Sequence, residues 1–129
     1  MKWPVVLAVT VVILVLGGIT LNRTLTMLGC HDAIRQSVAS VDGQFVAAVV
    51  ERDCGATTAY STLVFVTRAG GPFNPRERSP VFVIRGQNDV QLEWQRPGSL
   101  SVSYSPGKIV KSEASYDRIQ LSYTERPVP

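Results

Sequence analysis

Between Trp3 and Leu21 the chain reads WPVVLAVTVVILVLGGITL and carries no charged residue. Only Thr10 and Thr20 have polar side chains in this stretch. At about 1.5 Å of rise per residue, a helix of this length spans roughly the 30 Å of a bilayer core. A buried helix of a soluble domain would show polar residues at a period of 3.6, and none appear here. The segment therefore predicts a membrane-inserted helix.

Such a segment is a retained anchor, a cleaved signal peptide or the leader of a lipoprotein. Lys2 precedes the apolar run and favours a cytoplasmic N-terminus. Gly18 and Thr20 form a poor signal-peptidase site, and Met27-Leu28-Gly29-Cys30 is a poor lipobox because it begins with Met. We therefore expect a retained anchor in the bacterial inner membrane, with the rest of the chain in the periplasm.

This interpretation divides the chain into an anchor over residues 1–21, spanning the membrane with residues 4–21, a connector over 22–29 and a domain over 30–129. The net charge of +3 arises near the anchor, since removing Lys2 and Arg23 from thirteen basic residues leaves eleven against ten acidic ones. A balanced domain lacks the basic patch that nucleic acid requires. We expect no nucleic-acid partner, no metal and no small-molecule cofactor.

Cys30 and Cys54 are the only cysteines of the chain. If the domain faces an oxidising compartment, an even pair is most simply a disulfide. Two alternatives have weaker support. A metal site at Cys30, His31 and Asp32 has suitable ligand types, but the chain has one His and no second spaced pair. A reactive Cys54 would need a depressed pKa, and its charged neighbours Arg52 and Asp53 roughly cancel.

The domain reads as an all-β fold, because turn signals recur at short intervals and no amphipathic helix of convincing length follows Leu25. Strand-length runs lie between the turns. In three runs, apolar and polar residues alternate: 90–94, 100–104 and 119–123. Three other runs are apolar on both faces: 45–50, 63–66 and 81–84. A weaker run covers 34–38. They predict a small antiparallel meander or sandwich of six or seven strands, with the doubly apolar runs at its centre.

The Arg96–Ser99 segment reads as a hairpin connection, which sets the flanking strands antiparallel. One face of this hairpin is then apolar and is expected to be buried: Val90, Leu92, Trp94, Leu100, Val102 and Tyr104. The other face is polar and is expected to meet water or a partner: Gln91, Glu93, Ser101 and Ser103.

The longest irregular stretch runs from Ala69 to Pro80 and contains glycines, prolines and charged residues. Loops of this kind often carry binding functions, although a solvated hairpin tip has the same composition. The candidate binding residues in it are Gly71, Phe73, Asn74, Arg76 and Arg78.

A distinctive motif, Asp53-Cys54-Gly55-Ala56-Thr57-Thr58, follows a first Cys and the Ser-x-Asp-Gly turn at residues 40–43. In this pattern the chain, from Cys30 to about Tyr104, resembles a family of small, uncharacterised bacterial envelope proteins with an N-terminal signal, anchor or lipobox. The resemblance implies a periplasm-facing β domain with a Cys30–Cys54 bridge. It supplies no catalytic residues, because that family has no settled activity.

The motif is explained by a turn, since Gly55 permits a positive φ and Asp53 with the threonines can accept hydrogen bonds from turn amides. We therefore expect no catalytic residues and favour a non-enzymatic accessory module that binds an unknown envelope protein partner. One alternative is a small envelope enzyme or thiol-active protein using His31, Asp53 and Cys54, or Thr57 as a nucleophile. Another is a membrane-tethered immunity or inhibitor protein.

Overall fold

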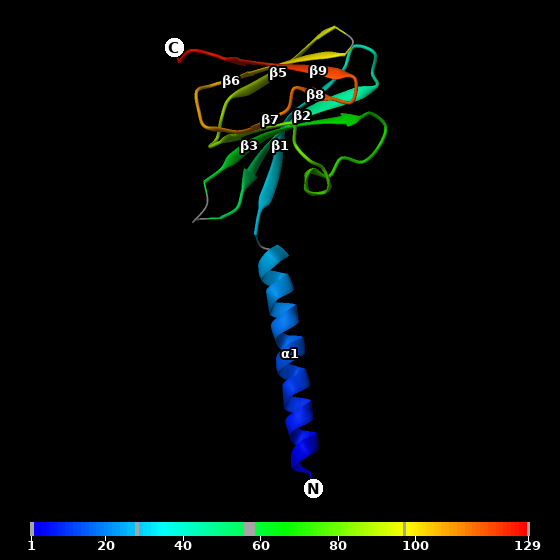
Figure 1. The fold of residues 1–129 in the computed structure, drawn as a ribbon, viewed down its shortest axis with the longest axis vertical. Coiled ribbons are helices and arrows are strands. Elements are labelled where there is room, and N and C mark those ends of the chain that lie inside the picture. The colour runs from blue at the N-terminus through cyan, green and yellow to red at the C-terminus, as the bar shows by residue number, and fades with distance from the viewer. Residues whose placement is uncertain (1, 28, 56–58, 97, 129) are drawn as a thin grey trace. The chain divides into compact units, whose positions relative to one another are not determined.

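The computed structural model describes residues 2–27, 29–55, 59–96 and 98–128. The chain forms two compact units, Met1–Cys30 and His31–Pro129, which are described separately. The first unit holds the only helix longer than one turn among the described residues, and the second holds all the described strands (Figure 1).

Helix α1 runs from Trp3 to Met27. Its segment Trp3–Leu21 is long and apolar enough to cross a membrane, and none of it is buried against the rest of the chain. The two threonines do not break this character, because each hydroxyl donates back to the helix. Thr10 Oγ1 lies 2.8 Å from Val6 O, and Thr20 Oγ1 lies 3.0 Å from Leu16 O. Such internal hydrogen bonds satisfy polar groups where water is absent. Most of the expected connector, as far as Met27, is helical.

The described residues of the β domain form nine strands in two sheets, which confirms the predicted all-β fold with more strands than the six or seven expected (Figure 1). The five-stranded sheet has the order β1-β2-β3-β4-β7 and the four-stranded sheet the order β5-β6-β9-β8. The strands are β1 His31–Ala39, β2 Phe45–Asp53, β3 Ser61–Arg68, β4 Phe82–Arg85, β5 Val90–Arg96, β6 Ser99–Tyr104, β7 Ile109–Ser112, β8 Ser115–Tyr116 and β9 Ile119–Glu125. Every strand predicted from the sequence is present. The two short strands β7 and β8 were not predicted.

The topology departs from a simple antiparallel meander, because the chain changes sheet after β4, β6 and β7 and because one pair of strands is parallel. Strand β9 pairs with β6 in parallel, with Leu100 opposite Leu121 and Val102 opposite Tyr123. Between these two strands the chain leaves the four-stranded sheet, adds β7 to the edge of the other sheet, and returns through β8. This crossover ties the two sheets together along one side of the sandwich.

The main core lies between the sheets, where aromatic and branched side chains interlock. Phe82 of β4 is its aromatic centre, since its ring lies 5.1 Å from that of Tyr123 and 5.3 Å from that of Tyr104. The fully buried large side chains of this core are Phe45, Phe82, Ile84, Leu100, Ile119, Val64 and Val102.

The β5–β6 hairpin has the predicted register, with Val90 opposite Tyr104, Leu92 opposite Val102 and Trp94 opposite Leu100. Its apolar face is buried in the core, except that Trp94 is only partly buried. Gln91 and Glu93 are exposed on the opposite face, whereas Ser101 and Ser103 are half-buried.

A second, smaller core covers the outer face of the five-stranded sheet. It consists of Val50, Leu63 and Phe65, with Phe73 and Val83 packed against them. This cluster explains why the runs that form β2 and β3 are apolar on both faces: one face meets the other sheet, and the loop that carries Phe73 covers the other.

Candidate functional site

The two cysteines mark one end of the β1–β2 ladder. Neither is free, and each is disulfide-bonded. Cys30 precedes His31 and Cys54 follows Asp53, and His31 and Asp53 are register partners. Continuing that antiparallel register by one step brings the two cysteines opposite each other. The bond therefore closes the ladder at its end.

The motif that follows β2 forms a turn around Asp53. Its Oδ1 accepts a hydrogen bond of 3.0 Å from the main-chain N–H of Gly55, whose φ is +102°. The negative charge of Asp53 is also the main cause of the raised pKa of the Tyr60 hydroxyl. Asp53 thus holds the chain reversal, and only Gly tolerates the φ of position 55 without strain. Ala56, Thr57 and Thr58 lie outside the described residues, so the constellation of Thr57 with His31 and Asp53 stays a sequence hypothesis.

The candidate binding loop folds back onto the five-stranded sheet. Phe73 lies edge-on to Phe65 with ring centroids 5.4 Å apart, and Gly71 lines a small apolar hollow of about 190 Å³ beside it. Asn74 begins the short 3-10 helix η1, Pro75–Glu77, by accepting a hydrogen bond of 3.1 Å from Arg76 N–H. Arg76 Nε lies 3.9 Å from Asp32 Oδ2 on β1, while Arg78 is exposed. The loop therefore acts as a cover for the second core.

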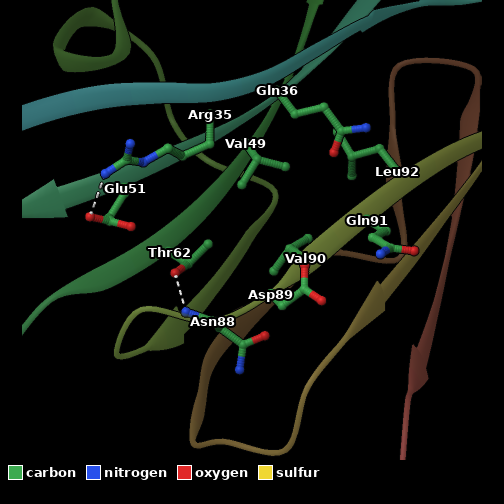
Figure 2. A pocket seen from close by; sticks show the side chains of 10 residues that line it. All are labelled: Arg35, Gln36, Val49, Glu51, Thr62, Asn88, Asp89, Val90, Gln91 and Leu92. Carbon is green, nitrogen blue, oxygen red and sulfur yellow. Dashed lines mark hydrogen bonds and ion pairs between the residues drawn. The ribbon is translucent and has the colours of Figure 1, made fainter.

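A larger pocket, of about 580 Å³, opens between the two sheets on the side where β1 and β5 are the edge strands (Figure 2). We call it the β1–β5 cleft. Its walls are mainly polar, and its lining residues come from β1, β2, β3, and the start of β5 with the residues just before it. They are Arg35, Gln36, Val49, Glu51, Thr62, Asn88, Asp89, Val90, Gln91 and Leu92.

A β-bulge in β1 shapes the wall of the cleft that this strand forms. The register with β2 shifts between Ile34 and Gln36, so Arg35 is an extra residue in the edge strand. An extra residue lets two consecutive side chains reach the same side of a strand, and Arg35 and Gln36 both line the cleft. Arg35 Nη2 lies 3.0 Å from Glu51 Oε1.

Glu51 is held in place from two sides. Gln87 Nε2 and Arg35 Nη2 each donate to Glu51 Oε1 over 3.0 Å. These donors, Gln87 first and Arg35 second, hold the pKa of Glu51 below its usual value. The carboxylate therefore stays ionised and paired near neutral pH.

The wall formed by Asn88 and Asp89, just before β5, is fixed by hydrogen bonds within the domain. Asn88 N–H donates to Thr62 Oγ1 over 3.0 Å, and the Asn88 side chain bonds both main-chain groups of Ser105, at 2.6 Å to the oxygen and 3.0 Å to the nitrogen. The Asp89 carboxylate lies 3.0 Å from Arg126 Nη2. These side chains hold the connection between β4 and β5 and are not free to bind a ligand without rearranging.

Two polar side chains of the lining remain uncommitted. Within the described part of the chain, the amides of Gln36 and Gln91 make no hydrogen bond to another side chain or to the main chain. Gln36 extends from β1 toward β5, whereas Gln91 lies at the rim of the cleft, on the face of β5 opposite to Val90 and Leu92 (Figure 2). Gln91 was expected to face water or a partner, but its place in a cleft was not predicted. Gln36, Glu51 and Asn88 were missed because only the bulge and the tertiary fold bring them together.

Trp94 lies on β5 two residues beyond Leu92, which lines the cleft. Its ring Nε1 donates to the main-chain oxygen of Val38 on β1 over 3.1 Å. This contact connects the two edge strands.

The described residues contain no group of three His, Cys, Asp or Glu side chains arranged to hold a metal ion. The arrangement can present hydrogen-bond donors and acceptors to a ligand, and it pairs the charges it already has. Comparison of the chain with protein-family models, with curated protein sequences and with solved structures finds no match.

Proposed function

We propose that this chain is a single-pass protein of the bacterial inner membrane whose β domain binds an envelope protein in the periplasm through the β1–β5 cleft. The observation that carries the proposal is the cleft itself. It is open and polar and lies between two sheet edges. The Gln36 amide inside it and the Gln91 amide at its rim have no partner among the described residues, whereas its charged side chains are paired.

The membrane part of the proposal rests on α1. A helix of this length and hydrophobicity crosses a bilayer with its hydroxyls satisfied internally. Lys2 before the helix favours a cytoplasmic N-terminus. The disulfide is in keeping with an oxidising compartment on the other side. The resemblance of the Asp53–Thr58 motif to bacterial envelope proteins supports the same placement.

The binding part rests on what a stable fold does not need. A domain whose only task is to remain folded gains nothing from polar amides that stay without partners at a cleft. In recognition sites a small number of placed polar groups fixes the orientation of the ligand. Arg35 and Glu51 give one wall a fixed shape, because each holds the other.

Site-specific photo-crosslinking in living cells tests this function. A photoreactive amino acid replaces Gln91 at the rim of the cleft, and in a matched strain it replaces Gln120, an exposed glutamine on β9. We expect a discrete crosslinked product from position 91 that is absent from position 120 and disappears when Gln36→Lys places a charge on the β1 side of the cleft. Equal products from both positions, or none from position 91, would contradict the proposal.

A further inference from the structure

We infer that the occupant of the β1–β5 cleft is an extended, uncharged peptide segment that pairs with β5 as an added strand. This inference rests on the proposed function and specifies the chemistry of the partner. It follows from the main-chain pattern of β5, from the state of the other sheet edges, and from the charges around the cleft.

The main chain of β5 presents free hydrogen-bonding groups to the cleft. Ser105 N–H donates to Asp89 O over 3.3 Å, so the main-chain groups of Asp89, and by alternation those of Gln91 and Glu93, point toward β6. Those of Val90 and Leu92 then point away from β6, toward the open edge. Because the Val90 and Leu92 side chains are buried in the core, these residues line the cleft with their backbone.

The other sheet edges are protected from strand addition. Strand β7 has four residues, is preceded by Lys108 and contains Lys111, and β8 has only two residues. Strand β1 is interrupted by the bulge at Arg35. Short strands, lysines and bulges are the usual devices that stop edges from pairing. Strand β5 has none of them between Val90 and Trp94, where its register with β6 is regular.

The charges of the cleft favour a neutral segment. Arg35 is paired with Glu51, and Asp89 is paired with Arg126. A charged residue of the ligand would therefore lose water without gaining a free counter-charge. The amides of Gln36 and Gln91 can instead bond to the backbone or to hydroxyl and amide side chains of the segment. Pairing of this kind takes its affinity from main-chain hydrogen bonds.

The test uses the full-length chain in detergent and a phage-displayed library of random linear dodecapeptides. A selected peptide is resynthesised with one N-methyl group at a time, which removes one N–H donor. We expect a loss of affinity of about tenfold at every second residue of the paired stretch and little change at the residues between, because only alternate N–H groups face β5. Charged residues should be rare in that stretch.

A pair of protein variants tests the same contact from the other side. Val90→Pro removes an N–H that faces the cleft, and Val90→Ala shortens the same side chain but keeps that N–H. We expect Val90→Pro to weaken peptide binding about tenfold relative to Val90→Ala. If Val90→Pro does not fold, the N-methyl series on the peptide decides alone.

The outcomes separate this inference from the proposed function. A further variant, Gln91→Lys, shows whether a selected peptide binds at the cleft. If Gln91→Lys weakens peptide binding but the N-methyl series shows no alternation, strand addition is overturned and the cleft remains the binding site. A failure to select any peptide would also overturn the inference, while crosslinking from position 91 would still support the proposed function. Self-association of the chain that Val90→Pro abolishes would assign the β5 edge to a second copy and overturn the inference.

Discussion

Ser40 is a buried polar residue at the tight turn between β1 and β2. Its hydroxyl donates to Asp42 Oδ1 over 2.7 Å and accepts the N–H of Phe45 over 3.0 Å. Asp42 also accepts the N–H of Gln44 over 3.1 Å. The Ser-x-Asp-Gly sequence is thus a set of local bonds that reverses the chain directly before the fully buried Phe45.

Replacing Ser40 by Ala leaves the buried N–H of Phe45 with its main acceptor removed. We expect Ser40→Ala to lower the free energy of unfolding by about 1–3 kcal/mol, the usual cost of an unsatisfied buried polar group. Urea unfolding followed by tryptophan fluorescence measures this free energy. Ser37→Ala, at an exposed position of β1, is the control. Equal stability of the two variants would contradict this account of the turn.

Asp32 of β1 and Arg52 of β2 are register partners and form a bidentate ion pair. Arg52 Nε lies 2.7 Å from Asp32 Oδ1, and Arg52 Nη2 lies 2.9 Å from Asp32 Oδ2. The hydrogen bonds from Arg52 are the main reason that the pKa of Asp32 is lowered. A carboxyl with a lowered folded pKa binds its proton less readily in the folded state than in the unfolded state, so it stabilises the fold at higher pH.

This pair predicts a pH dependence of stability. The contribution of Asp32 is fully present above its unfolded pKa, near 3.8, and is lost as the pH falls through the lower folded value. We expect Asp32→Asn to be less stable than the parent at pH 7 and to lose less stability between pH 7 and pH 3. Urea unfolding at both pH values measures this, and parallel pH profiles for the two proteins would contradict it. The pKa values of Asp42 and Glu51 are also lowered, so these carboxylates act in the same direction.

At the level of elements, the disulfide closes a loop that contains β1, the turn and β2. In the chain-entropy model, a closed loop of about 25 residues stabilises the folded state by about 3.5 kcal/mol. We expect Cys30→Ser and Cys54→Ser to lower the melting temperature by similar, large amounts, because either change removes the same bond. Scanning calorimetry measures both. One variant that is as stable as the parent would show that the bond does not support the fold.

The β5–β6 hairpin offers a test of the register with adjacent residues. Trp94 packs against the core and donates to Val38 O, whereas Glu93 is exposed on the other face. We expect Trp94→Ala to cost about 3 kcal/mol, at the lower end of the range for aromatic residues because its ring is only partly buried. Glu93→Ala should change stability by less than about 0.5 kcal/mol. Chemical denaturation that ranks Glu93→Ala as the more damaging change would contradict the register.

The strands with clear periodicity could be predicted from the sequence, because alternation along 90–94, 100–104 and 119–123 reports one buried face directly. The apolar runs in β2 and β3 likewise indicated strands that are covered on both faces of the sheet. The short strands β7 and β8 could not be predicted, since Ile109 and Val110 are both exposed at an edge and produce no period of two. The parallel pairing of β9 with β6 depends on a crossover that local patterns do not encode.

The cleft could not be predicted for a related reason. Its polar residues come from strands that are distant in the sequence, and the bulge that turns both Arg35 and Gln36 toward it follows from register and not from composition. The candidate loop over 69–80 was singled out by composition, yet Phe73 packs it onto the sheet. Composition singled out the 69–80 loop as a surface segment. The open edge of β5 could be located only from the way the strands pair.

At the scale of the whole molecule, the protein combines a helix long and apolar enough to cross a membrane with a β domain whose described strands include β5, an edge strand of regular register. These parts have distinct chemistry. Residues 3–21 carry no charge, and the domain has nearly equal numbers of basic and acidic residues. The proposed function assigns binding of an extended segment to the domain and attachment to the membrane to the helix.

The lysines of the chain allow one measurement to test this central claim. Lys2 lies before the apolar helix, and Lys108 and Lys111 lie in the β domain, Lys108 being exposed. Intact spheroplasts are treated with a membrane-impermeant amine reagent, and the chain is extracted from the membrane and analysed by mass spectrometry. We expect the chain to contain Lys2 in unmodified form and Lys108 in modified form, and permeabilised membranes to show both modified. A chain that lacks Lys2, or one modified at Lys2 and not at Lys108, would contradict the account.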